Sequence, residues 1–279
     1  MGIFNTLFGK KNGAAQPQND IPAMRDWGVY SGYVHETFSS ISLDLSLKKV
    51  APVKNQPNVV WVSVTLNIAR PNGMPSREES VTLESIEKNL SNTLAKKQSI
   101  TFIGKVSAEG VQSFYFYSAD TVAAEKTIAE VMRAFPEYKY SSSAKVDPGW
   151  SEYFALYPSS EQQQSLKNLK VVYQLQKNGD VLTKERSVDH WIYFKLTGDR
   201  EAFSQKVEQD GFVVLKKDTD LSNPRSRMAL LPKEYPYVLH IARSDKVDYP
   251  SVEKYTLKLW KLAKEHNGEY DGWGTEVVK

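Results

Sequence analysis

The chain has 279 residues, of which 41% are hydrophobic and 25% are charged, so it has a globular composition and, at about 150 residues per domain, room for two domains. Its 36 basic and 33 acidic residues leave a net charge of only +3, which argues against the concentrated basic field of a typical nucleic-acid-binding protein. No cysteine is present, which excludes disulfides, thiolate nucleophiles, Cys-ligated zinc and iron–sulfur clusters.

Residues 1–22 are predicted to be a disordered tail, because the segment Lys10–Asp20 is rich in Gly, Ala, Gln, Asn and Pro and has little to bury. No apolar run reaches the roughly 20 residues that a membrane-spanning helix needs. The N-terminus also lacks the small-residue cleavage site of a secretory signal. We therefore expect a cytoplasmic protein with no membrane partner.

The first domain is predicted over residues 23–158. Half-buried strands are expected at Trp27–Val34 and Phe38–Leu47, and four apolar residues of the second should share one face, since successive strand side chains alternate: Ile41, Leu43, Leu45 and Leu47. The order strand, helix, strand, strand, helix, strand then follows, with these segments: Val59–Ala69 closed by a turn at Pro71-Asn72-Gly73, Glu78–Lys97, Ser99–Val106, Val111–Tyr117, a helix N-capped by Asp120, and Tyr138–Val146.

Residues 159–179 are predicted to form a connecting helix. The turn Asp147-Pro148-Gly149-Trp150 ends the preceding pattern, and Pro158-Ser159-Ser160-Glu161 opens a helix over Glu161–Lys177 that Gly179 would stop. This helix is apolar from Leu166 to Leu175, so it should pack on at least one of the two domains.

The second domain is predicted over residues 180–279, where the same order of elements recurs. The expected segments are strand Ser187–Leu196, helix Asp199–Gln209 ended by Gly211, strand Phe212–Lys216, further strand formed by Met228–Leu231 and Tyr237–Ala242, helix Tyr249–His266 and strand Glu269–Val277. Two successive β-α-β-β-α-β units predict an α+β fold with two ferredoxin-like sandwich domains joined by a helix.

The string Glu269-Tyr270-Asp271-Gly272-Trp273-Gly274-Thr275 follows the last predicted helix. With Asp189-His190-Trp191, Gly211-Phe212 and Gly268, it resembles the C-terminal signature of the regulator of ribonuclease activity B (RraB) family, whose members inhibit bacterial ribonuclease E. The resemblance covers roughly residues 180–279. It implies a non-catalytic bacterial protein that binds and modulates a ribonuclease.

The upstream half carries a second resemblance. Trp27, the turn Asp147-Pro148-Gly149-Trp150, Glu152-Tyr153 and Tyr157-Pro158 are similar to an uncharacterised bacterial domain family that is often fused to RraB-like domains. The RraB family is acidic, whereas residues 180–279 contain 17 basic and 17 acidic residues. The acidity of the inhibitor is therefore not matched here.

Glycines on both sides of Trp273 suit a bulged or sharply turned strand. Two interpretations follow. Trp273 is displayed at the centre of a recognition edge, or it is a structural plug that fixes the last strand. The first interpretation makes five residues a candidate partner-binding site: Tyr270, Asp271, Gly272, Trp273 and Gly274.

The four histidines form no close metal motif, and no nucleophile elbow, phosphate loop or dinucleotide fingerprint is present. His190 and His240 are expected on neighbouring strands, where they could approach each other, but Asp189 would point to the opposite face. We therefore predict no metal site, no catalytic residues and no cofactor.

A row of lysines lines one face of the last long helix: Lys254, Lys258, Lys261 and Lys264. They could contact RNA or an acidic partner, or form the solvated face opposite the apolar stripe. The leading prediction is a non-catalytic protein-interaction protein that regulates a ribonuclease. An RNA-binding module that uses these lysines and exposed aromatic residues is the alternative, and an enzyme of unrecognised type is the third.

Overall fold

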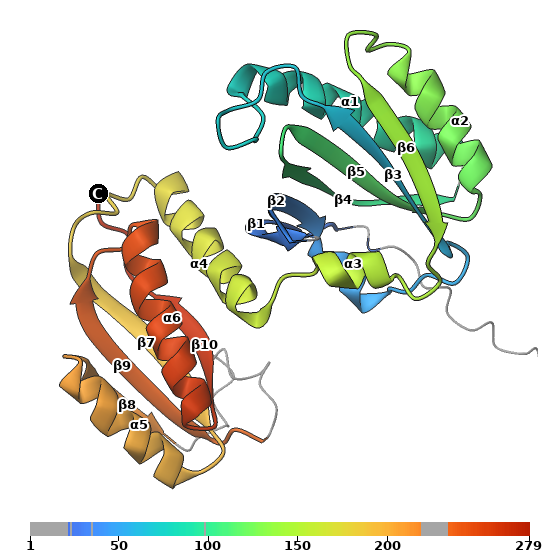
Figure 1. The fold of residues 1–279 in the computed structure, drawn as a ribbon. Coiled ribbons are helices and arrows are strands. Elements are labelled where there is room, and N and C mark those ends of the chain that lie inside the picture. Colours follow the sequence, from blue (N-terminus) through green and yellow to red (C-terminus); the bar gives the residue numbers. More distant parts are fainter. Residues whose placement is uncertain (1–21, 23, 35, 98, 219–233) are drawn as a thin grey trace, which may run out of the picture. The chain divides into compact units, whose positions relative to one another are not determined.

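The computed structural model describes residues 22, 24–34, 36–97, 99–218 and 234–279, and Figure 1 shows their fold. The chain divides into two units, Met1–Tyr157 and Pro158–Lys279, and each has its own antiparallel sheet and its own hydrophobic core. Within the described ranges, no helix is both long enough and apolar enough to cross a membrane. The predicted strand Met228–Leu231 and all of the predicted tail except Pro22 lie outside the described residues.

A six-stranded sheet forms the centre of the N-terminal unit, and every neighbouring pair of strands is antiparallel. The spatial order is β1-β2-β4-β5-β3-β6, so the β1–β2 hairpin extends one edge of the sheet. The strands are β1 (Trp27–Val34), β2 (Thr37–Asp44), β3 (Asn58–Thr65), β4 (Ile100–Ala108), β5 (Val111–Ser118) and β6 (Tyr140–Val146).

Two long helices, α1 (Arg77–Lys97) and α2 (Thr121–Met132), cover one face of this sheet (Figure 1). The N-cap predicted for α2 is confirmed, because the Asp120 carboxylate accepts a hydrogen bond from the backbone N–H of Ala123 at 3.0 Å. Phe114 and Phe116 of β5 are fully buried beneath the helices. The alternation along β5 turns the intervening tyrosines to the opposite face.

That opposite face has a second apolar cluster beneath two short helices, η1 (Leu45–Lys49) and α3 (Ser151–Leu156). Trp150 is its centre: the indole is completely buried, stacks on Tyr117 with ring centroids 4.0 Å apart, and donates from Nε1 to the carbonyl of Gln56 at 3.0 Å. The last residue of the predicted turn Asp147-Pro148-Gly149-Trp150 is therefore a core side chain. The helix α3 that follows was not predicted.

The second strand is shorter than predicted. It ends at Asp44, whose carboxylate accepts a hydrogen bond from the backbone N–H of Ser46 at 3.0 Å and so caps η1. A short polar side chain that bonds to the backbone two residues ahead favours a turn over continued strand. Leu45 and Leu47 consequently belong to η1, and the prediction that all four apolar residues share one strand face is wrong at these two positions.

Asp147 connects β6 to α3. Its carboxylate accepts hydrogen bonds from the backbone N–H groups of Ser151 and Glu152, at 2.9 and 3.0 Å, and from the Tyr117 hydroxyl at 2.5 Å. Burial alone would raise the pKa of Asp147. The hydrogen bonds from Glu152, Tyr117 and Ser151 favour the charged form more strongly and lower the pKa to about 2.

We expect this carboxylate to make the stability of the N-terminal unit pH-dependent. Its folded pKa lies below the ordinary value of 3.8, so its contribution is present above about pH 4 and is lost as the pH falls through 2. The loss should be about 2 kcal/mol. Denaturant unfolding of the wild type and of Asp147→Asn at pH 7 and pH 2 measures it. The difference between the two proteins should shrink at pH 2, and an equal difference at both pH values would contradict the prediction.

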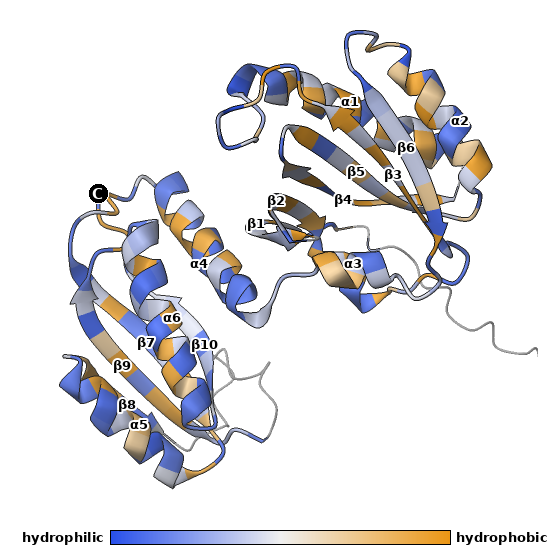
Figure 2. Cartoon of the chain, viewed as in Figure 1, coloured by the Kyte–Doolittle hydropathy of each residue, from blue (hydrophilic) through white to orange (hydrophobic). Residues whose placement is uncertain are grey.

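The C-terminal unit has a four-stranded sheet in the order β10-β7-β9-β8, again with antiparallel neighbours only. Two helices, α5 and α6, supply the apolar residues that pack on one face of it. Along α6, apolar residues are interleaved with polar ones, as an amphipathic helix requires (Figure 2). The elements are β7 (Arg186–Phe194), α5 (Thr197–Gln209), β8 (Val213–Asp218), β9 (Tyr237–Asp245), α6 (Tyr249–Glu265) and β10 (Gly268–Gly274).

Helix α4 (Ser160–Lys177) lies inside the C-terminal unit. It begins with a capping box, in which the Ser159 hydroxyl and the Gln162 side chain each bond to the other residue's backbone N–H. Val172 and Leu175 are buried in a cluster with residues of α6 and β10. The segment predicted to connect two domains is therefore packed on the second unit.

Candidate functional site

The signature strand β10 is an edge strand that pairs with β7. The register shifts between Tyr270 and Gly272, because Tyr270 pairs with Ile192 and Gly272 pairs with the next residue, Trp191. A bulge of this kind inserts one extra residue, here Asp271. Tyr270 and Trp273, three positions apart, therefore both point to the side of the sheet that packs on the helices.

Trp273 is a core residue, with only 2% of its surface exposed. Its indole Nε1 donates to the Asn168 side-chain oxygen at 3.1 Å, and Val172, Leu175 and Tyr255 belong to the same apolar cluster. The geometry matches the interpretation of Trp273 as a structural plug. In this structure the side chain is not available to a partner.

Asn168, on α4, is the centre of a buried polar network and is itself completely buried. Its Nδ2 donates to Glu253 Oε2 at 2.9 Å and to Thr256 Oγ1 at 2.7 Å. Its Oδ1 accepts from Trp273 and, at 3.3 Å, from Gln164 Nε2. All four hydrogen bonds that an amide side chain can make are thus formed, and they join α4 to α6 and β10.

The other aromatic residue of the signature, Tyr270, is 4% exposed, and its hydroxyl lies 2.8 Å from His190 Nδ1. His190 is completely buried between the rings of Phe212, Tyr255 and Tyr270. This burial, reinforced by the positive charge of Arg243, lowers the pKa of His190 to about 3, and burial raises the pKa of Tyr270 well above its ordinary value. Both groups are therefore uncharged at neutral pH.

The two central histidines lie on opposite faces of the sheet, so the expectation that they approach each other is wrong. His240 pairs with Trp191 in the register, one position away from His190, and its ring stacks on the Trp191 indole with centroids 4.9 Å apart. Its Nε2 lies 2.6 Å from Asp189 Oδ1. Asp189 lies on the face opposite His190, as predicted, and this places it beside His240, a contact that was not predicted.

No group of three His, Cys, Asp or Glu side chains that could hold a metal ion occurs among the described residues. Of the remaining signature residues, Thr275 donates from Oγ1 to the Ser187 carbonyl at 2.7 Å, whereas the glycines contribute backbone only. A Cβ on Gly274 would lie 3.5 Å from the Trp191 ring, and a Cβ on Gly268 would come within 2.6 Å of the buried Phe194 ring. The glycine at position 268 thus lets β10 approach β7 closely.

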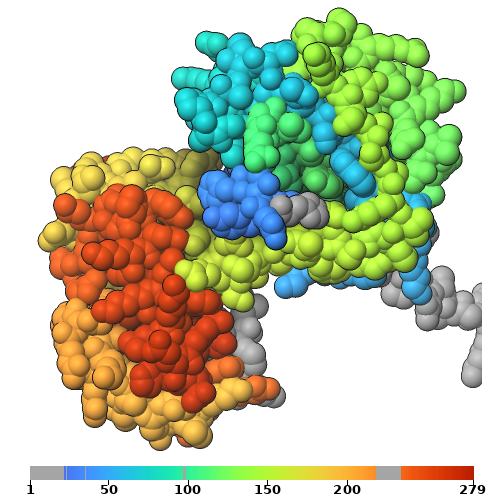
Figure 3. Space-filling model, in the orientation of Figure 1, coloured from blue at the N-terminus to red at the C-terminus, as the bar shows by residue number. Residues whose placement is uncertain are grey.

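The four lysines of the predicted row are all exposed on α6: Lys254, Lys258, Lys261 and Lys264. Figure 3 shows this helix, in orange to red, on the outer surface of its unit. Two of the lysines pair with carboxylates, Lys258 with Asp210 at 2.7 Å and Lys261 with Glu161 at 2.9 Å. These ion pairs reduce the free positive charge that the row presents to a polyanion.

The comparisons with known proteins fall on both units. Residues 25–157 match the model described as "Family of unknown function (DUF695)", and residues 165–275 match the model described as "Regulator of ribonuclease activity B". None of the curated proteins matches the chain.

Among solved structures, the crystal structure of a protein named as a glycine cleavage system transcriptional repressor is 11% identical, with 78% of this chain and 98% of that chain covered and a TM-score of 0.22. A similarity this low supports no conclusion about fold or function. The family matches do confirm the sequence resemblance: residues 25–157 match the first family model and residues 165–275 match the second, in the predicted order.

Proposed function

We propose that this protein is a non-catalytic regulator that binds a protein partner, and that the partner is a ribonuclease of the ribonuclease E type. The observation that carries the proposal is the match of residues 165–275 to a family of ribonuclease regulators. A location in the cytoplasm, where such a partner would be met, belongs to the same proposal. The buried state of the signature aromatics supports a role for Tyr270 and Trp273 in holding the fold of this unit.

We also infer that both units are ferredoxin-like sandwiches. In the C-terminal unit the elements follow the order β-α-β-β-α-β, and the fourth strand lies beside the first at one edge. The N-terminal unit repeats this order from β3 to β6 and adds the β1–β2 hairpin at the edge beyond β4. The regulator would thus consist of two related frameworks, in each of which the two helices of the β-α-β-β-α-β unit lie on one face of the sheet.

We place the partner-binding surface on the outer face of α6. A groove of about 790 Å³ follows this helix, and its lining includes the apolar Leu257 and Leu262, the lysines Lys254, Lys258 and Lys261, and the carboxylates of Glu253 and Glu265. Apolar side chains bordered by positive charge suit an acidic segment of a protein partner, because the apolar groups give contact area and the lysines steer the encounter.

A binding experiment tests the proposal: the full-length chain is immobilised and a purified ribonuclease E-type enzyme is passed over it. We expect it to retain the enzyme and to change its rate of RNA cleavage. The double variant Lys254→Glu/Lys261→Glu should bind about tenfold more weakly, a change of about 1.4 kcal/mol. Lys206→Glu, a matched charge reversal on an exposed lysine of α5, should leave binding unchanged.

Two results would contradict this assignment. If the chain neither retains the enzyme nor changes RNA cleavage, the ribonuclease is not its partner. If it instead binds RNA alone, with an affinity that falls steeply with salt, the lysines of α6 serve a nucleic-acid site.

A further inference from the structure

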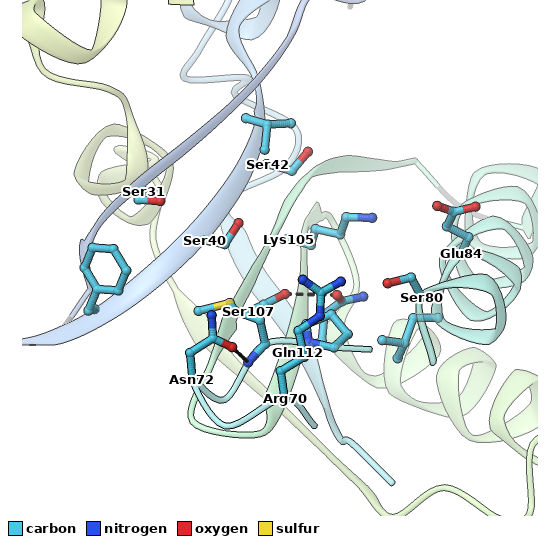
Figure 4. Close-up of a pocket in the computed structure, with 15 residues that line it drawn as sticks. Ser31, Ser40, Ser42, Arg70, Asn72, Ser80, Glu84, Lys105, Ser107 and Gln112 are labelled. Carbon is cyan, nitrogen blue, oxygen red and sulfur yellow. Dashed lines mark hydrogen bonds between the residues drawn. The ribbon is translucent and has the colours of Figure 1, made fainter. Parts of the chain in front are cut away.

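A cavity of about 550 Å³ opens on the helix-covered side of the N-terminal sheet. In Figure 4 its side chains come from three directions: Ser31, Ser40 and Ser42 from the β1–β2 hairpin, Ser80 and Glu84 from α1, and a third group from β4, β5 and the loop before α1. The cavity exists because the hairpin extends the sheet beyond the helices. Its volume is that of a site for a small molecule.

A row of polar side chains crosses the sheet beneath this cavity. In the register Ser31 is opposite Ser40, Ser40 is opposite Ser107, and Ser107 is opposite Gln112, so four adjacent strands each contribute one polar group. The next position along β5 on the same face is the fully buried Phe114. The polar row thus begins where the apolar core ends. Ligand sites are commonly built in this way, with a few polar groups beside an apolar wall.

Gln112 has a side-chain hydrogen-bond donor that a ligand could use. It is only 3% exposed and lines the cavity. Its Oε1 accepts from the Ser107 hydroxyl at 2.9 Å (Figure 4), while its Nε2 has no hydrogen-bond partner among the described residues. A buried amide N–H without an acceptor is unfavourable. An oxygen atom of a bound molecule would supply that acceptor.

Arg70 adds a positive charge at the same cavity. Its guanidinium has no ion pair among the described residues, and its backbone is fixed: Arg70 N–H donates to the Met74 carbonyl at 2.7 Å, and Gly73 N–H donates to the Arg70 carbonyl at 2.8 Å. Gly73 has a φ of 76° and lies so close to the β4–β5 turn that a Cβ would come within 2.9 Å of the Glu109 nitrogen. The loop that carries Arg70 is thereby held in place.

The other charged groups of the lining are Lys105 and Glu84. The Lys105 ammonium is 2.6 Å from the Glu87 carboxylate, which offsets its charge, whereas the Arg70 guanidinium faces no paired carboxylate among the described residues. A guanidinium offers two parallel N–H donors, which fit a carboxylate or a phosphate.

We propose that this cavity binds a small organic molecule through an oxyanion group, a carboxylate or a phosphate, with Arg70 and the Gln112 amide as its donors. The hydroxyls of Ser40 and Ser42 line the cavity toward the β1–β2 hairpin, where they can bond to polar groups on the rest of the ligand. The site belongs to the N-terminal unit alone and is independent of the partner proposed for the C-terminal unit.

The proposal is tested by isothermal titration calorimetry of the full-length chain with succinate and with glycerol 3-phosphate. The titrations are made at matched ionic strength, and glycerol is the neutral control. We expect one of the two anions to bind and glycerol not to bind. Arg70→Ala should weaken binding at least tenfold. Arg133→Ala, a matched loss of an exposed arginine beside α2, should not change it.

Gln112→Leu should weaken the binding of the same anion. The circular dichroism spectrum of this variant shows whether it is folded. Because Arg70 is exposed, the Arg70→Ala result remains decisive if Gln112→Leu does not fold. Binding of succinate alone identifies a carboxylate site, and binding of glycerol 3-phosphate alone identifies a phosphate site. Binding of neither anion at millimolar concentrations, or equal binding by Arg70→Ala and the wild type, would overturn the proposal.

Discussion

A fragment that begins at Pro158 is expected to unfold in one cooperative transition, whereas a fragment that begins at Asp180 is expected to lose most or all of that transition. The two differ by helix α4 and its cap. Since α4 packs on α6 within the C-terminal unit, the shorter fragment would expose one side of α6 to water.

The size of the effect follows from three buried side chains of α4: Leu166, Val172 and Leu175, each at most 7% exposed. Burial of an aliphatic side chain contributes about 1.5–3 kcal/mol, so the three together supply roughly 5–8 kcal/mol. A typical domain has a net stability of about 5–15 kcal/mol. Removal of α4 also leaves the indole N–H of Trp273 without its acceptor, Asn168, which adds to the loss.

Thermal unfolding of both fragments, followed by circular dichroism, measures this difference. The fragment from Asp180 should show a broad transition or none. A control fragment that begins at Pro158 and carries Lys167→Ala, at an exposed position of α4, should behave like its parent. Equal melting temperatures for the long and short fragments would show that α4 does not support the C-terminal unit.

Local sequence signals predicted most of the elements. Asp120 is the N-cap predicted for α2, the segment Pro158–Glu161 begins α4 as predicted, and Gly179 adopts a φ of 79° just after the end of α4. These features depend on residues a few positions apart. Helix α3 was missed because Ser151–Leu156 is a short segment whose N-terminal N–H groups bond to Asp147, and strand periodicity gives no indication of that capping.

The candidate sites depend on contacts that are distant in sequence. Trp273 donates a hydrogen bond to Asn168, which is 105 positions earlier in the chain. The glycine pattern around the tryptophan therefore predicted a bulge but not the face of the sheet on which the indole lies. The cavity beside Arg70 arises because β2 pairs with β4, more than 50 residues later in the chain. The pairing of His240 with Asp189 depends on the register between β7 and β9. None of these registers can be deduced from one strand alone.

Replacement of Trp273 by alanine should destabilise the C-terminal unit by about 3–5 kcal/mol, the usual loss when a large buried side chain is removed. Replacement by phenylalanine should cost only about 1–2 kcal/mol, because the ring stays packed and only the hydrogen bond to Asn168 is lost. A tryptophan displayed for a partner would behave differently: its loss would weaken binding and leave stability unchanged. Comparison of the two variants therefore separates a structural role from a recognition role.

A double-mutant cycle with Trp273→Phe and Asn168→Ala, measured by denaturant unfolding of the full-length chain, isolates the hydrogen bond between them. We expect a coupling energy of about 1 kcal/mol, since each single variant already breaks the same bond. Gln164→Ala paired with Trp273→Phe is the control, because Gln164 bonds to the same Asn168 oxygen without touching the indole nitrogen; its coupling should be smaller. Fully additive losses for Asn168 and Trp273, with partner binding reduced in the still-folded Trp273→Phe, would instead assign this tryptophan to recognition.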